Sequence, residues 1–307
     1  MTVSALNLGG STATVTVYSN AGARLLRTIS LVAVDDLTKK LFNMTASSSG
    51  FLYIELPADP GQVKSPGLLT IYKGKGAKKI ASIGLSSNYY LLVADAVGNV
   101  YTMCKNRLMC EYNASGKSVR KINVGKYGWN GAEALAVDSS GDLAIVYNDA
   151  AMVFPPGATK PSWSIGSSQG MGGNISATFD PSGNLYIAGI NDKVFVFAPN
   201  ASSPSYVIED GVANPSEVVC DSLGNLYVLN GSTIARYAQG ESTPESTIGV
   251  GPSAVSMALD AADNLYVANE GGSGNTGSVT VYAAGSNSLV RTVTNGIEGP
   301  ASVGVSP

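Results

Sequence analysis

The chain has 307 residues, of which 44% are hydrophobic and only 13% are charged, and its net charge is −3. Since charged residues usually make up about 25% of a globular protein, this composition favours buried strands under a thinly charged surface. The low net charge and the lack of a Lys or Arg block exclude an electrostatic case for nucleic acid. No apolar stretch reaches the length of about 18 residues that a membrane span requires, so no membrane insertion is expected.

The N-terminal residues 3–29 predict three strands, because β-branched and aromatic residues alternate with polar ones between Gly, Asn and Ser clusters. The same three-strand pattern returns near the C-terminus, in residues 266–293. Two insertions follow the N-terminal strands. Residues 31–40 are expected to hold one helical turn capped by Asp35, and residues 56–66 form a long loop with prolines.

A turn of the form D-x-x-G-N-L-Y repeats along the rest of the chain. Five copies begin at Asp95, Asp138, Asp180, Asp221 and Asp260, and a degenerate copy begins at Ser47. The Asp is expected to cap its own turn with its side chain, and the Gly to take the left-handed conformation. Asp263 replaces that Gly in the last copy, as a residue that tolerates positive φ.

The spacing of these turns predicts a β-propeller. Neighbouring copies begin 39 to 48 residues apart, which is the period of a four-stranded propeller blade. In the fifth unit the strands are expected at residues 216–220, 226–229, 233–237 and 246–248. Residues 300–306 resemble the first strand of a unit and would complete a seventh blade with the three N-terminal strands. We therefore predict an all-β fold, a seven-bladed propeller closed by the C-terminal strand, as one domain over residues 1–307. Six blades with frayed ends are the alternative.

The repeats from about Asn130 onward resemble the NHL and YVTN groups of propellers. The resemblance rests on Pro215, Val218 and Asp221 in one unit, and on residues 264–269 with 279–282 in another. It implies a propeller architecture but no single activity, because such propellers serve as lyases, lactonases and binding modules. The lyases of similar fold rely on histidine, and this chain has none. The gluconolactonase-like relatives hold a divalent metal with carboxylate and Asn side chains.

The absence of histidine excludes Ser-His and Cys-His nucleophile pairs and histidine-based zinc sites. Counting back four residues from each turn Asp marks the positions expected to face a central channel. Among them Glu217 is the only charged residue and Asn43 a polar one. A single carboxylate makes a poor metal cage, so we expect no metal or cofactor, with a divalent cation at Glu217 as the alternative.

Aromatic residues on one loop suggest a binding rim. Tyr127, Trp129 and Asn130 lie in the glycine-rich segment 125–131, where the aromatic pair would suit a sugar ring or a partner's side chain. The alternative is that Trp129 fills a gap between blades. Asp149, Asp192 and Glu270 are expected on the same rim, with Asn191, Asn230 and Asn269 nearby.

The three cysteines have two interpretations. Cys104 and Cys110 flank a predicted tight turn, within disulfide range across antiparallel strands. The simpler interpretation, which we prefer at this point, is that both of them and Cys220 are buried free thiols.

These observations predict a non-catalytic binding or scaffold module that recognises a protein or carbohydrate partner through its loop rim. A metal-dependent lactonase or hydrolase working near Glu217 is one alternative, and a purely structural module of a larger surface protein is another. The few charges and many Ser, Thr and Asn residues favour a location outside the cytoplasm: extracellular, at the cell surface or periplasmic.

Overall fold

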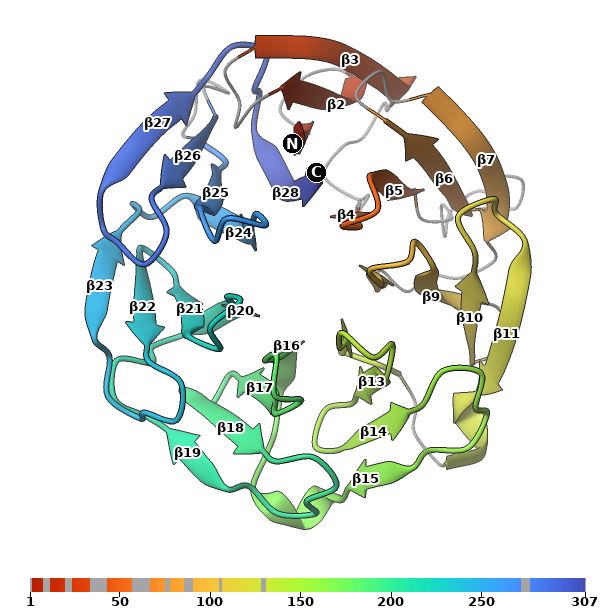
Figure 1. Ribbon diagram of the computed structural model, residues 1–307, viewed down its shortest axis with the longest axis vertical. Helices are drawn as coiled ribbons and strands as arrows, with labels where there is room; N and C mark the ends of the chain where they lie inside the picture. Colours follow the sequence, from red (N-terminus) through yellow and green to blue (C-terminus); the bar gives the residue numbers. More distant parts are fainter. Residues whose placement is uncertain are drawn as a thin grey trace. The chain divides into compact units, whose positions relative to one another are not determined.

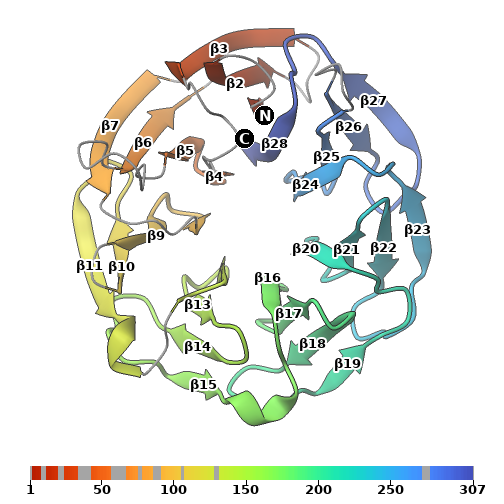
Figure 2. The ribbon, with the colours of Figure 1, turned by 180° about the vertical axis from the view of Figure 1, so that it is seen from behind.

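The computed structural model describes residues 2–7, 12–19, 24–33, 43–56, 67–74, 78–85, 91–104, 107–127, 131–271 and 277–306. These residues form seven four-stranded antiparallel sheets, and the fold is the predicted seven-bladed β-propeller (Figures 1 and 2). The chain divides into two compact units, residues 1–121 with 253–307 and residues 122–252. The expectation of one domain over residues 1–307 stays a prediction.

The first unit holds four blades, with the end of the last strand of blade two passing into the second unit. The strands of blade seven are β28 (Pro300–Ser306), β1 (Thr2–Asn7), β2 (Thr12–Ser19) and β3 (Arg24–Ala33). Those of blade one are β4 (Asn43–Ala46), β5 (Phe51–Leu56), β6 (Gly67–Lys73) and β7 (Lys78–Leu85). Those of blade two are β8 (Leu92–Ala94), β9 (Val100–Cys104), β10 (Leu108–Tyr112) and β11 (Ser118–Asn123). Those of blade six are β24 (Ala254–Leu259), β25 (Leu265–Asn269), β26 (Ser278–Tyr282) and β27 (Leu289–Val293).

The second unit holds blades three to five and two short 3₁₀ helices, η2 (Val124–Tyr127) and η3 (Ser167–Gln169). The strands of blade three are β12 (Ala134–Val137), β13 (Leu143–Val146), β14 (Ala151–Phe154) and β15 (Trp163–Ile165). Those of blade four are β16 (Asn174–Phe179), β17 (Leu185–Gly189), β18 (Lys193–Phe197) and β19 (Tyr206–Ile208). Those of blade five are β20 (Pro215–Cys220), β21 (Leu226–Asn230), β22 (Thr233–Tyr237) and β23 (Ser246–Gly249). The strands predicted for the fifth unit agree with these bounds to within one residue.

Blade seven is completed by strands from both ends of the chain, as predicted. β28 pairs with β1 in antiparallel register, with Thr2 opposite Ser306 and Asn7 opposite Pro300. This pairing gives β1 a neighbour on each side, β28 and β2, so β1 presents no free backbone edge and β28 is the end strand of the sheet. Within the first unit β28 also lies beside β24 and β4, the first strands of the blades on either side of it.

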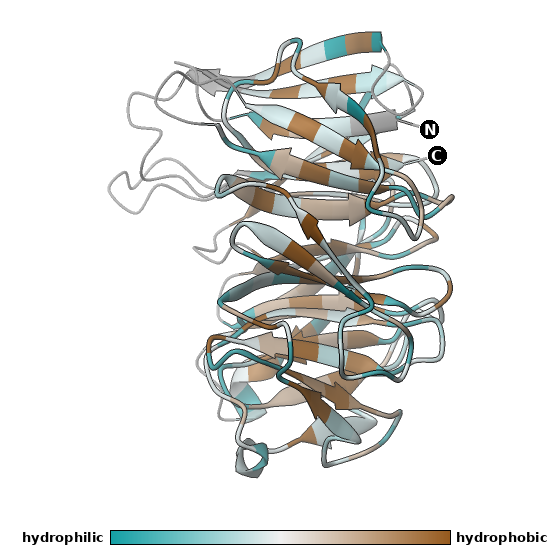
Figure 3. Ribbon diagram, turned by 90° about the vertical axis from the view of Figure 1, so that its left-hand side faces the viewer, coloured by the Kyte–Doolittle hydropathy of each residue, from teal (hydrophilic) through white to brown (hydrophobic). Residues whose placement is uncertain are grey.

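The second strand of blade four is buried on both faces because blades three and five cover it. Every residue of β17, β21 and β25 is buried, so the alternation of residue types along these strands does not translate into alternating exposure. Alternation is visible instead on outer strands such as β11, in which buried and exposed residues alternate from Val119 onward. Figure 3 shows that hydropathy also changes from residue to residue along the strands. The resulting core fills the space between consecutive blades; between blades three and four it includes Val146, Ile187 and Phe195.

The turns between the first and second strands have the predicted backbone. The glycines of the D-x-x-G copies have positive φ, for example 87° at Gly141 and 83° at Gly224. Asp263 has φ 61°, so the residue that replaces glycine in the last copy adopts the same left-handed conformation. The helical turn expected after Asp35 lies outside the described residues, as do residues 57–66 of the long loop, while β3 extends as far as Ala33.

Candidate functional site

In four blades the turn aspartate is held by a complete set of hydrogen bonds. In blade six, Oδ1 of Asp260 accepts from the backbone N–H groups of Ala262 at 2.8 Å and Asn264 at 3.0 Å. Its Oδ2 accepts from Asn264 Nδ2 at 2.9 Å and from the hydroxyl of Tyr266 at 3.0 Å. The turns that begin at Asp95, Asp180 and Asp221 repeat this arrangement. The prediction that these aspartates serve their own turns is confirmed. The Asn and Tyr of the motif are donors to the same carboxylate, a role that the sequence analysis missed.

Blade three departs from this arrangement. Oδ1 of Asp138 accepts from the N–H groups of Ser140 at 2.9 Å and Asp142 at 2.8 Å, as in the other copies. The motif's Asn is replaced by Asp142 and its Tyr by Ala144, however, and neither side chain can donate. Burial and the nearby Asp138 carboxylate raise the pKa of Asp142. The sequence shows this substitution as a break in the repeat, but its meaning becomes clear only when the Asn and Tyr of the motif are known to be hydrogen-bond donors.

The loops at the other end of the blades form a connected surface in residues 122–252. We call this surface the loop face; it comprises residues 147–150, 166–174, 189–193, 209–215 and 230–232. Asn148 Oδ1 accepts from Gly173 N at 3.1 Å, and Asn174 Nδ2 donates to Tyr147 O at 2.8 Å. Asn230 Nδ2 donates to Gly211 O at 2.8 Å and its Oδ1 accepts from Ala213 N. Side chains therefore tie each turn between the second and third strands to a loop that connects two blades.

An apolar side chain stands on the loop face. Ile190, directly after β17, is 67% exposed. Its N–H donates to Gly173 O at 3.0 Å, and a Cβ added at Gly173 would collide with the Ile190 side chain. Gly173 has φ 60°, a conformation that glycine adopts without cost. The isoleucine is therefore exposed on a backbone that is already fixed.

The predicted aromatic pair is only partly described. Trp129 and Asn130 lie outside the described residues. Tyr127 is half-buried at the end of η2, with its hydroxyl donating to Thr159 O at 3.4 Å. Its ring meets that of Phe154 edge-on, with centroids 6.1 Å apart, and Lys126 Nζ lies 4.8 Å from its centroid. Tyr127 is thus held by neighbours from blade three.

The predicted acidic residues of the rim lie in different surroundings. Asp149 is half-buried in the turn after β13. Asp192 is exposed, but its Oδ1 accepts from Asn214 N at 2.6 Å and so fixes the loop between blades four and five. In the other unit, Glu270 is exposed directly after β25, and its N–H donates to Ser253 O at 2.8 Å. Asp149 and Asp192 belong to the loop face, and Asp192 has a structural role there.

The positions expected to face a channel carry contacts between blades. Ser176 Oγ accepts from Val218 N at 3.1 Å, which joins β16 to β20. In the first unit, Ser302 Oγ donates to Met44 O at 3.4 Å and joins β28 to β4. Glu217 is half-buried opposite Leu229, and Asn43 is half-buried with its Oδ1 accepting from Met44 N. The channel-facing role of Glu217 and Asn43 stays a prediction.

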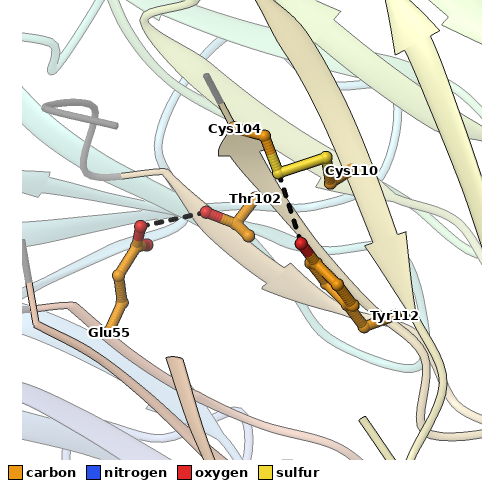
Figure 4. The surroundings of a disulfide bond; sticks show 5 residues. All are labelled: Glu55, Thr102, Cys104, Cys110 and Tyr112. Carbon is orange, nitrogen blue, oxygen red and sulfur yellow. Dashed lines mark hydrogen bonds between the residues drawn. A yellow bond between two sulfur atoms is a disulfide. The ribbon is translucent and has the colours of Figure 1, made fainter. Parts of the chain in front are cut away.

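A buried carboxyl group that the sequence analysis missed lies between blades one and two. Glu55, on β5, is 1% exposed, and its Oε1 accepts from Thr102 Oγ1 on β9 at 3.0 Å (Figure 4). Its Oε2 has no partner among the described residues. Burial raises the pKa of Glu55 to about 8, because desolvation outweighs the stabilising hydrogen bond from Thr102. The sequence places Glu55 near the end of an apolar strand but does not indicate whether its side chain faces solvent or a neighbouring blade.

Cys104 and Cys110 form a disulfide, so the preferred interpretation of three free thiols was wrong (Figure 4). In the β9–β10 register Leu108 is opposite Cys104, and Cys110 is opposite Thr102. The two cysteines are therefore diagonal neighbours on one face of the hairpin, with Cα atoms 5.9 Å apart, inside the range for a bridge. Cys220 is a free thiol, and burial raises its pKa well above the ordinary value.

Two common functional features are absent from the described part of the chain. No group of three or more His, Cys, Asp and Glu side chains is placed there to hold a metal ion. No helix of the described ranges is long and apolar enough to cross a membrane.

The geometry defines the class of protein, a seven-bladed β-propeller with four-stranded blades, in which the C-terminal strand completes blade seven. Comparison with protein-family models finds no match, and comparison with curated proteins finds none either.

Proposed function

We propose that this protein is a non-catalytic binding module that recognises a protein partner through the loop face. The main support is the exposed Ile190, which lies on loops that are already joined by hydrogen bonds: Asn148 and Asp192 accept from backbone N–H groups, and Asn174 donates to a backbone carbonyl. A surface fixed in advance loses little conformational entropy on binding, and an exposed aliphatic side chain can supply an apolar anchor.

A protein partner fits this surface better than a glycan does. Carbohydrate rings favour an exposed aromatic platform, whereas the Tyr127 ring packs edge-on against Phe154 and its hydroxyl is bonded to Thr159. The exposed group on the loop face is aliphatic, and the surrounding side chains are amides bonded to backbone. An aliphatic centre with a polar surround is the arrangement of protein interfaces.

The test compares two aliphatic side chains of similar exposure. Wild type, Ile190→Asp and Leu223→Asp are immobilised and exposed to an extract of the source cells, and retained proteins are identified and their affinities measured. Leu223 is 73% exposed in a turn between first and second strands, away from the loop face. If Ile190 is an interface anchor, its replacement weakens binding about 30-fold, while Leu223→Asp binds as wild type does.

Equal retention by wild type and Ile190→Asp would contradict the proposal. Binding on a glycan array, with no protein retained, would assign the surface to carbohydrate instead.

The proposal also covers the protein's location and its family. The Cys104–Cys110 disulfide supports a location outside the cytoplasm, because structural disulfides persist in oxidising compartments. The repeated turn and the four-stranded units support membership of the NHL and YVTN type of propeller.

A further inference from the structure

A cavity of about 210 Å³ lies where blade three meets blade four. Its lining includes Trp163, Phe179 and Pro199 as apolar walls, and the carboxylates of Asp138 and Asp142. Hydroxyl-bearing Ser140, Ser162 and Ser182 also line it. All of these residues belong to the unit of residues 122–252, and the cavity is separate from the loop face.

The equivalent carboxylate in blade four shows what is missing at this cavity. Asp180 Oδ2 accepts from three side chains: Asn184 Nδ2 at 2.8 Å, the Tyr186 hydroxyl at 3.5 Å and Gln239 Nε2 at 3.2 Å. Gln239 comes from blade five, two residues after the end of β22, and reaches across to blade four.

Blade three lacks all three of these donors. Asp142 stands where Asn184 is, and Ala144 where Tyr186 is. Pro199, two residues after the end of β18, takes the place of Gln239 and has neither a side-chain donor nor a backbone N–H. Asp138 Oδ2 consequently receives no hydrogen bond from the part of the chain that the structure describes. Asp138, Asp142 and Pro199 all line the cavity.

The chemistry of the lost groups indicates what would fill the space. All three were hydrogen-bond donors, two of them N–H, and the replacement of Asn by Asp adds a negative charge beside Asp138. A cationic N–H donor satisfies both conditions, since it supplies the missing hydrogen bonds and compensates the second carboxylate. A bare metal ion needs six or more oxygen ligands and would leave most of this volume and its aromatic wall without a contact.

We propose that this cavity binds an alkyl ammonium or guanidinium group, which donates hydrogen bonds to Asp138 Oδ2 and the Asp142 carboxylate while its hydrocarbon chain lies against Trp163 and Phe179. The cation takes the place that Asn, Tyr and Gln side chains occupy in blade four. This site is independent of the partner proposed for the loop face.

The experiment is a calorimetric titration of the intact protein with n-butylammonium, followed in parallel by intrinsic tryptophan fluorescence, to which Trp163 contributes. Binding is expected for n-butylammonium and none for 1-butanol, which has the same chain without the charge. Asp142→Asn restores the internal donor found in the other blades and removes one charge, so the dissociation constant should rise about tenfold or more. Glu241→Gln removes an exposed charge elsewhere in the same unit and should leave the constant within about twofold.

A second variant distinguishes a loss of binding from a loss of folded protein. Asp138→Asn keeps a side-chain acceptor for the two backbone N–H groups of the turn, so this variant should preserve the fold while abolishing binding. Equal binding of n-butylammonium and 1-butanol, no binding of either, or unchanged binding in both variants would overturn the proposal.

The source of the cation is distinguished by a further titration with N-acetyl-lysine methylamide. If the blocked lysine binds as n-butylammonium does, the cavity accepts a lysine side chain of a partner. Binding of n-butylammonium alone assigns the cavity to a small free amine. Both results support the shared chemistry, and neither depends on Ile190.

Discussion

The replacement Glu55→Gln should stabilise the protein by an amount that grows with pH. Glu55 is buried between blades one and two, and burial raises the pKa of its carboxyl group from 4.5 to about 8. An acid whose pKa is higher in the folded state contributes stability that is fully present below pH 4.5 and is lost as pH rises toward 8. Each pH unit in this window lowers the free energy of unfolding by about 1.4 kcal/mol, which amounts to about 3 kcal/mol at pH 7.

Glutamine has nearly the same shape as glutamate, keeps an acceptor for Thr102 Oγ1 and does not ionise. The free energies of unfolding of wild type and Glu55→Gln should therefore agree near pH 4 and differ by about 3 kcal/mol at pH 7, with a further increase toward pH 8. The assay is urea denaturation from pH 4 to 9, with Glu241→Gln as an exposed control whose difference from wild type stays flat. A pH-independent difference for Glu55→Gln would refute the reasoning, since it would mean that the carboxyl titrates alike in both states.

Further changes test the turn motif and the disulfide. Asp221→Ala removes the acceptor of two backbone N–H groups and two side chains, and should lower the free energy of unfolding by about 2–4 kcal/mol in urea denaturation; a change below 0.5 kcal/mol would contradict the role of the turn. Tyr266→Phe removes one hydroxyl bonded to Asp260 and should cost about 1 kcal/mol by the same measurement, with an unchanged value speaking against a stabilising bond. Replacing both Cys104 and Cys110 by Ser should lower the free energy of unfolding by about 2 kcal/mol, because the disulfide closes a short loop, and reduction of the wild type should lower it by the same amount. If only the replacement lowers it, the effect comes from packing and not from the disulfide. Asp142→Asn should raise thermal stability, corresponding to about 1 kcal/mol, because it returns a donor to the turn; no gain would indicate that Asp138 Oδ2 is already satisfied by solvent.

The sequence predicts the turn motif well because its physics is local. The Asp cap and the left-handed Gly act within five residues, so their roles follow from spacing alone, and Asp263 fits the same rule. The two donors to Oδ2 are also encoded in the motif, and their loss at Asp142 and Ala144 is visible once the other copies show what they do.

The candidate sites were less accessible to prediction. Tyr127 looked like a platform for a ligand, but its partners Phe154 and Thr159 come from another part of the chain, and only their positions show that the ring is packed. Asp192 looked like a ligand-binding carboxylate, and the loop that it fixes at Asn214 is not adjacent in sequence. The preferred interpretation of Cys104 and Cys110 as free thiols was wrong because a diagonal contact depends on the register of β9 and β10.

By itself, the sequence determined the number of blades, the strands within each repeat and the closure of blade seven by the C-terminal strand, because these follow from a period that local turns and hydrophobic patterns impose. The tertiary structure alone decided what happens between blades: the burial of Glu55 against Thr102, and the cavity where Pro199 faces Asp138. The physical reason is that a carboxylate's energy depends on the donors and solvent around it, and those are supplied by residues tens of positions away.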